Sequence, residues 1–241
     1  LLKEWMSFEP QGDAKWKLLD WLWYNGQRDE ALRLSGELIQ ERREPTQNVR
    51  LRSQTAYYHL QDGNIPQAIA QIAKAEEVIK YEFSSLSRRG SMPFWIARAQ
   101  LEFYMAKSET EAAQGKWAAA IESSQIAVSR GRDLFRMLSM AGNEDYAAMA
   151  RRVILMTQGQ LGARQIDAGL YSDAEWTFRE TYKQGKQYGF NEHQMPPLYE
   201  RIADLYNASG RFSEAIQFAQ KSEKILAERK VDPQSARWIQ T

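Results

Sequence analysis

The fold is decided by residues 199–216, YERIADLYNASGRFSEAI, where an apolar helical pattern stops at a glycine and a second pattern follows at once. Before Gly210, the residues Tyr199, Ile202 and Tyr206 lie three or four places apart, so they share one face of a helix. Glycine readily takes the left-handed backbone conformation that ends a helix. The stretch therefore predicts two helices joined at a tight corner.

The same corner occurs five times along the chain. Each copy has glycine in the first position and alanine in the sixth, and the copies begin at Gly26, Gly63, Gly115, Gly169 and Gly210. The alanines that follow are Ala31, Ala68, Ala120, Ala174 and Ala215. We expect alanine there because two helices cross too closely for a larger side chain. The third position is apolar in four copies and is expected to pack into the corner, at Ile65, Trp117, Tyr171 and Phe212.

Stacked corners of this kind predict an all-α fold. Strand signals are nearly absent, and a short helix pair cannot bury its apolar face alone, so neighbouring pairs must stack. We therefore predict a right-handed solenoid of antiparallel helix pairs. Residues 1–241 are expected to form a single repeat domain of about five pairs, with turns near the five glycines, cut from a longer chain.

The last copy resembles a tetratricopeptide repeat (TPR). In that family an aromatic residue, a Leu-Gly pair and a Tyr mark the first helix, and here Tyr199, Ile202-Ala203 and Tyr206 occupy those positions. Leu161-Gly162 supplies the pair in the preceding copy. The resemblance implies a TPR-like superhelix that binds a protein or peptide in its concave groove.

The spacing of the corners departs from the simple family. Successive corner glycines are 37, 52, 54 and 41 residues apart, whereas the simple repeat recurs at about 34. Longer spacing is similar to the kinesin-light-chain-like repeats of bacterial regulators and scaffolds, and to repeat regions attached to caspase-like peptidase domains. It predicts long helices over residues 92–114, 117–139 and 143–168.

Composition sets several functions aside. The chain has 32 Lys and Arg against 31 Asp and Glu, and no cysteine, which excludes disulfides and thiolate metal sites. Its two histidines, His59 and His193, are about 130 residues apart and fit packing or solvated roles. We predict no catalytic residue, no metal and no cofactor, so the chain is not expected to be an enzyme.

No apolar run is long enough to span a bilayer, so no membrane insertion is expected. A cytoplasmic location is favoured, and the oligomeric state stays open.

Nucleic-acid binding is the alternative function. Basic pairs occur at Arg42-Arg43, Arg88-Arg89 and Arg151-Arg152, but the net charge of +1 and the irregular repeat spacing argue against it, so no nucleic acid is expected as a partner. An array of that kind would show a continuous basic stripe. A sensor arm of a transcriptional regulator is a further alternative.

In a stacked array, the first helices of the pairs line the groove. The register above places twelve candidates there: Trp16, Asp20, Trp23, Arg50, Ser53, Tyr57, Glu102, Met105, Glu109, Glu200, Asp204 and Asn207. Their mixture of aromatic, Met and charged side chains suits a peptide or helical ligand. The dense aromatic cluster around Trp21 is read first as a packed face and, alternatively, as an anchor for a partner.

Overall fold

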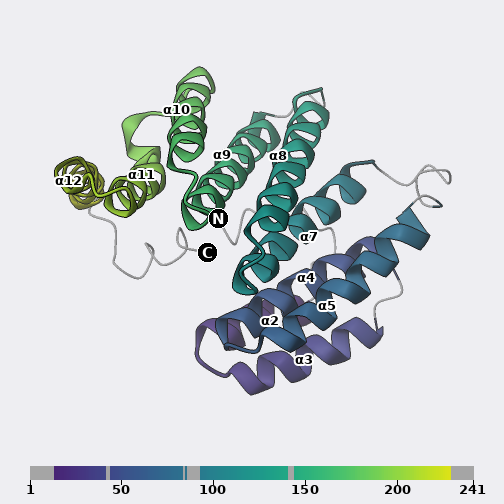
Figure 1. The fold of residues 1–241 in the computed structure, drawn as a ribbon. Coiled ribbons are helices and arrows are strands. Elements are labelled where there is room, and N and C mark those ends of the chain that lie inside the picture. The colour runs from purple at the N-terminus through teal and green to yellow at the C-terminus, as the bar shows by residue number, and fades with distance from the viewer. Residues whose placement is uncertain (1–13, 42–43, 84, 86–92, 141–143, 229–241) are drawn as a thin grey trace. The chain divides into compact units, whose positions relative to one another are not determined.

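The computed structural model describes residues 14–41, 44–83, 85, 93–140 and 144–228, with the side chains of 144–150 left aside. These residues form helices and contain no strand, which confirms the all-α prediction (Figure 1). The α-helices are α2 (Ala14–Tyr24), α3 (Arg28–Glu41), α4 (Pro45–Gln61), α5 (Ile65–Val78), α7 (Pro93–Ala113), α8 (Trp117–Met140), α9 (Glu144–Asp167), α10 (Tyr171–Gln187), α11 (Pro196–Ala208) and α12 (Phe212–Glu228). A π-helical turn, η1 (Ile79–Phe83), extends α5, and a 3-10 turn, η2 (Glu192–Gln194), precedes α11.

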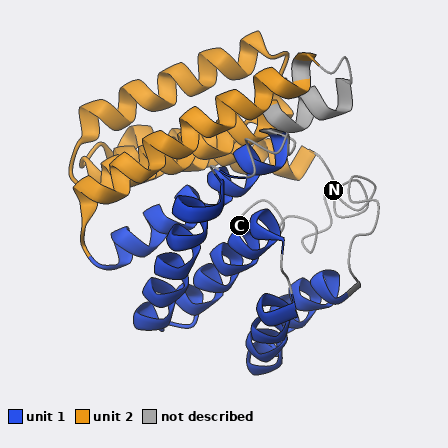
Figure 2. Cartoon of the chain, turned by 90° about the vertical axis from the view of Figure 1, so that its right-hand side faces the viewer, with its two compact units in different colours: residues 1–114 blue, residues 115–241 orange. Residues whose placement is uncertain are grey.

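The three long helices predicted from the spacing are confirmed to within a residue or so. Predicted 92–114, 117–139 and 143–168 correspond to α7, α8 and α9. The chain divides into two compact units, residues 1–114 and residues 115–241 (Figure 2). The first holds α2 to α7 and the second holds α8 to α12.

The corner glycines end their helices as predicted. The five have positive φ angles between 71° and 80°, in the left-handed region that glycine adopts without strain. At Gly63, the glycine N–H donates to the carbonyl of Leu60 at 3.0 Å and the Asn64 N–H donates to that of His59 at 2.7 Å. The Ala68 N–H then donates to the Asn64 carbonyl, closing the first turn of the next helix. These bonds satisfy the carbonyls left open at the helix end.

The alanines of the corners are buried, as predicted. Ala31, Ala68, Ala120 and Ala174 have no exposed surface, and Ala215 is 8% exposed. The residue three places earlier is different: Phe212 is 62% exposed, and Trp117 and Tyr171 stay more than a third exposed. The prediction that this residue packs into the corner is therefore wrong for these three. Each is the first residue of its helix, and a helical side chain points back toward the N-terminus, so here it points past the corner.

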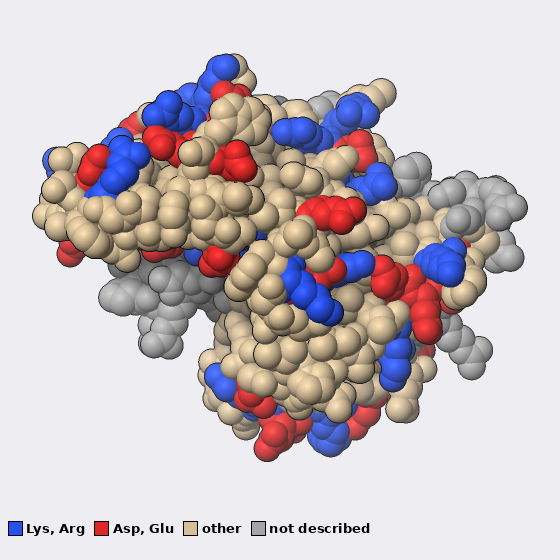
Figure 3. Space-filling model, in the orientation of Figure 1, with Lys and Arg blue, Asp and Glu red and all other residues tan. Residues whose placement is uncertain are grey.

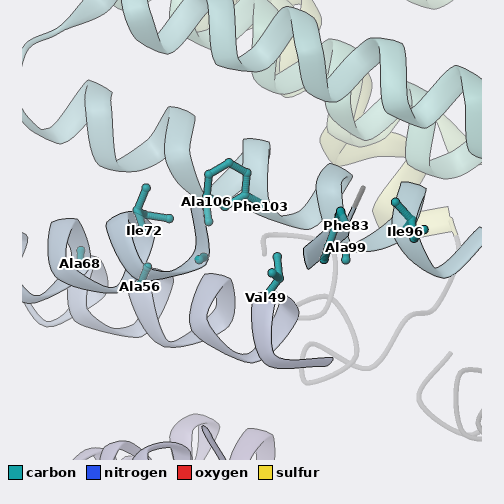
Figure 4. Packing of buried hydrophobic residues seen from close by; sticks show 10 residues of the cluster. Val49, Ala56, Ala68, Ile72, Phe83, Ile96, Ala99, Phe103 and Ala106 are labelled. Atoms are coloured by element: carbon teal, nitrogen blue, oxygen red, sulfur yellow. The ribbon is translucent and has the colours of Figure 1, made fainter. Parts of the chain in front are cut away.

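One of the two core clusters of unit 1 lies where α4, α5 and α7 meet, and the other lies between α2, α3 and α4. Figure 4 shows Val49 and Ala56 of α4 beside Ile72 of α5 and Phe103 of α7, all of them buried. Alanines at the crossings let the helix backbones approach, and the larger residues fill the space between them.

In unit 2, the predicted Leu161-Gly162 pair marks a close crossing of α9 and α10. A Cβ atom on Gly162 would come within 2.5 Å of Cζ of Phe178, whose ring is buried. A sixth corner, at Gly189, was not predicted. It joins α10 to the next pair through η2, so no alanine follows it in the sixth position.

Candidate interaction surfaces in the two units

Nine of the predicted groove residues lie on α2, α4 and α7 of unit 1, and we call them the first-helix set. Six are half-buried: Trp16, Asp20, Tyr57, Glu102, Met105 and Glu109. Trp23, Arg50 and Ser53 are buried. The hydroxyl of Ser53 donates to the Val49 carbonyl at 2.8 Å, so it serves its own helix.

A charged triad links α4 to α7 within this set. The carboxylate of Glu102 accepts from Nε of Arg50 at 2.9 Å and from Nε of Arg98 at 3.1 Å. Burial opposes ionisation of Glu102, but the two guanidinium groups outweigh it and hold the pKa of Glu102 below its usual value. The Arg50 guanidinium also lies 5.0 Å from the ring centre of Trp16, which ties α2 to the triad.

Asp20 on α2 is held by uncharged hydrogen-bond donors instead. It accepts hydrogen bonds from the Tyr58 hydroxyl at 2.7 Å and from the Gln54 amide. Burial raises the pKa of Asp20, and these two bonds only partly offset the effect. No Lys or Arg within the described ranges forms an ion pair with this carboxylate, so donors on a partner would find it uncompensated.

The aromatic cluster on α2 is mainly packing. Trp23 stacks on Tyr58 with ring centres 4.2 Å apart, and its indole N–H donates to Gln61 at 2.6 Å. Trp21 and Tyr24 are 56% and 45% exposed. The cluster thus contains a packed part and an exposed part.

The three predicted residues of unit 2 lie on α11. Glu200 accepts a hydrogen bond from the Ser222 hydroxyl at 3.1 Å, and Asp204 pairs with Arg201 at 3.6 Å. Glu200 and Asp204 border a shallow hollow of about 440 Å³ between α11 and α12, while the exposed Asn207 does not line it.

A second cavity in unit 2, of about 320 Å³, lies between α10, α11 and α12, and we call it the α10–α12 cavity. Its buried base is Phe178, Tyr199 and Leu205. Its walls are half-buried: Tyr182, Ile202, Tyr206 and Phe218. The charged residues Glu175, Arg179 and Lys221 line its rim.

Glu192 of η2 fixes the tyrosines beside this cavity. Its carboxylate accepts from the hydroxyl of Tyr182 at 3.1 Å, from the hydroxyl of Tyr199, and from Nζ of Lys186 at 2.6 Å, and it pairs with Lys221 at 3.4 Å. These donors, led by Lys186, lower the pKa of Glu192 to about 2. Sequence reasoning missed this residue because Glu192 belongs to a turn that lies outside the five predicted corners. The glycine at position 189 was the available signal for a turn here.

Lys221 and one further cation, Arg211, also lie over tyrosine rings beside the cavity. Nζ of Lys221 lies 4.2 Å from the ring centre of Tyr199, and the Arg211 guanidinium lies 4.2 Å from that of Tyr206. At the rim, Glu175 bonds both Arg179, at 2.7 Å, and Arg211, at 3.3 Å. The rim charges are therefore connected to one another by ion pairs.

The remaining sequence candidates do not assemble into a reactive site. Within the described residues, neither histidine side chain makes a hydrogen bond, and no group of three or more His, Asp or Glu is placed to hold a metal ion. Arg42-Arg43 and Arg88-Arg89 lie outside the described residues. On the face that Figure 3 draws, Lys and Arg are interspersed with Asp and Glu. None of the described helices has the length and apolarity needed to cross a membrane.

The helical corners and the paired helices define a helical-repeat protein. The chain matches no protein-family model and no curated protein sequence. It is similar to a solved structure of a substituted form of a Podosopora anserina kinesin light chain-type protein with nearly identical TPR-like repeats. The TM-score is 0.62 and the identity 16%, over 90% of this chain and 95% of that one. The chain therefore has the TPR-like repeat fold.

Two other solved structures align at much lower TM-scores. The unsubstituted Podosopora anserina protein gives 0.33 at 17% identity, over 79% of this chain and all of that one. The apo form of RapI gives 0.31 at 15% identity, over 90% of this chain and 66% of that one. Neither alignment adds to the assignment of the fold.

Proposed function

We propose that this chain is a protein-interaction scaffold, and that the first-helix set of unit 1 binds a peptide or a helix of a partner protein. TPR-like repeats expose the first helix of each pair as a continuous wall. Here that wall offers the half-buried Trp16, Tyr57 and Met105, which are residue types enriched in protein interfaces.

The observation that carries the proposal is the Arg50–Glu102–Arg98 triad. Its two arginines are buried and hold both oxygens of Glu102 by short bonds, so the exposed part of this carboxylate keeps one arrangement before a ligand arrives. A surface that is already ordered loses less entropy on binding. Asp20, which no cation of the described region neutralises, favours a ligand with a cationic or hydrogen-bond-donating group at that point.

The proposal includes that the chain does not catalyse a reaction. General acid–base catalysis needs a base within hydrogen-bond reach of its partner group. Burial lowers the pKa of His59, and its Nδ1 has no partner within the described region. His193 lies in the separate η2 turn of unit 2.

Site-specific photo-cross-linking tests the binding surface. A benzoyl-phenylalanine placed at Tyr57 on α4, or at Met105 on α7, should capture the same partner protein from a lysate of cells that make this chain. Ile69 on α5, which is 39% exposed on a second helix, is the matched control position. Capture at Ile69 that equals capture at Tyr57 and Met105 would contradict the proposal.

A further inference from the structure

We propose that the α10–α12 cavity of unit 2 is a second docking site, which receives one large apolar side chain from an acidic segment of a partner protein. This site goes beyond the proposed function, because it lies in another unit and uses none of the first-helix set.

The size of the cavity selects its occupant. Sites for cofactors and drug-sized ligands span about 300 to 1,000 Å³, so a volume of about 320 Å³ lies at the lower limit. The base and walls are aromatic or aliphatic, and the polar groups lie at the rim. One aromatic or branched aliphatic side chain fits such a lining and is the usual form of anchor in a protein interface.

The charges around the cavity select the flanking residues. Two cations and one carboxylate line it, namely Arg179, Lys221 and Glu175. Arg211 shares Glu175 with Arg179, and Lys186 shares Glu192 with Lys221. Glu175 is divided between two arginines, and the Arg179 side chain is 76% exposed. An incoming carboxylate can therefore pair with Arg179 without breaking an existing bond, whereas a basic segment would be repelled.

The tyrosine rings argue for a peptide and against a single-stranded nucleic acid. Nucleobases bind proteins by stacking on open aromatic faces. Here Lys221 lies over Tyr199 and Arg211 lies over Tyr206, each 4.2 Å from the ring centre, so a face of each ring is occupied. A side chain that enters edgewise between the walls needs no open face.

Selection from a random peptide display library on the full chain tests this site. The enriched peptides should combine one Trp, Phe, Tyr or Leu with neighbouring Asp or Glu. Arg179→Glu should weaken binding of an enriched synthetic peptide by about tenfold or more, since it reverses the rim charge. Lys183→Glu is the matched control, because Lys183 lies on the same helix, is 64% exposed and does not line the cavity; it should change binding by less than about twofold.

Two further variants test whether the enriched peptide binds in the α10–α12 cavity. Filling the cavity with Ile202→Phe should also abolish binding if circular dichroism shows that the variant folds, and Arg179→Glu remains decisive if it does not. Substitution of Tyr57 in unit 1 should leave binding unchanged, which separates this site from the proposed function. The inference is overturned if no peptide is enriched, if the enriched peptides lack acidic residues, or if Arg179→Glu and Lys183→Glu behave alike.

Discussion

Gly162→Ala tests how closely α9 and α10 cross in unit 2. A Cβ atom at this position would lie 2.5 Å from Cζ of Phe178 and 3.0 Å from its Cδ1, where ordinary carbon contacts need about 3.5–4.0 Å. Phe178 is 1% exposed and belongs to a packed cluster with Ala174 and Tyr199, so its ring cannot turn outward freely.

The expected loss follows from two opposing effects. Overpacking a tight core site costs about 1–3 kcal/mol. Replacing glycine by alanine inside a helix gains about 0.5–1 kcal/mol. We therefore expect Gly162→Ala to lower the free energy of unfolding by about 1–2 kcal/mol.

Gly159→Ala is the matched control on the same helix. A Cβ atom there has no neighbour within 4 Å, so only the helix gain of about 0.5–1 kcal/mol remains and the variant should be more stable than the parent chain. Urea unfolding followed by far-UV circular dichroism measures both variants. Equal stability of the two variants would refute the close crossing.

Three further predictions concern charge. Glu102→Gln should lower the free energy of unfolding by about 2–4 kcal/mol in urea titrations, because two buried arginines lose their carboxylate. Asp20→Asn keeps an acceptor for Tyr58 and removes a poorly solvated charge, so it should change the free energy of unfolding by no more than about 1 kcal/mol. Equal losses in these two variants would contradict the different roles assigned to the carboxylates. The pKa of Glu192 is about 2 in the folded chain and about 4.3 in the unfolded chain. Its contribution to stability is therefore present at neutral pH and falls as the pH drops from about 5 toward 2. Unfolding measured at a series of pH values should show a smaller loss of stability in acid for Glu192→Gln than for the parent chain. Mobility-shift titrations should detect no salt-sensitive binding of DNA or RNA, and tight binding that weakens steeply with salt would overturn that expectation.

The corners could be predicted because they are local. Gly210 and Ala215 act through backbone conformation and size within six residues, and both features are legible in the sequence. The corner at Gly189 was not predicted, because it connects two helix pairs and lacks the alanine in the sixth position. The misplaced Phe212 shows that an apolar residue in a recurrent position can still point to solvent when it begins a helix.

The polar contacts of the surfaces could not be predicted, because they join residues distant in sequence. Arg50 and Glu102 are 52 positions apart, and nothing in either segment singles out its partner. The repeat register predicted that Arg50 belongs to the first-helix set, but its burial and its ion pair depend on how α7 packs on α4. The α10–α12 cavity likewise arises from three helices together.

The close alanine crossing is the feature on which the whole account depends, and thermal unfolding of alanine-to-tryptophan variants at the corners measures it most directly. Ala174 has no exposed surface and Ala215 is 8% exposed, so Ala174→Trp and Ala215→Trp should each lower the melting temperature clearly, through an overpacking cost of about 1–3 kcal/mol or more. Melting temperatures that stay at the value of the parent chain in both variants would contradict the assigned corners.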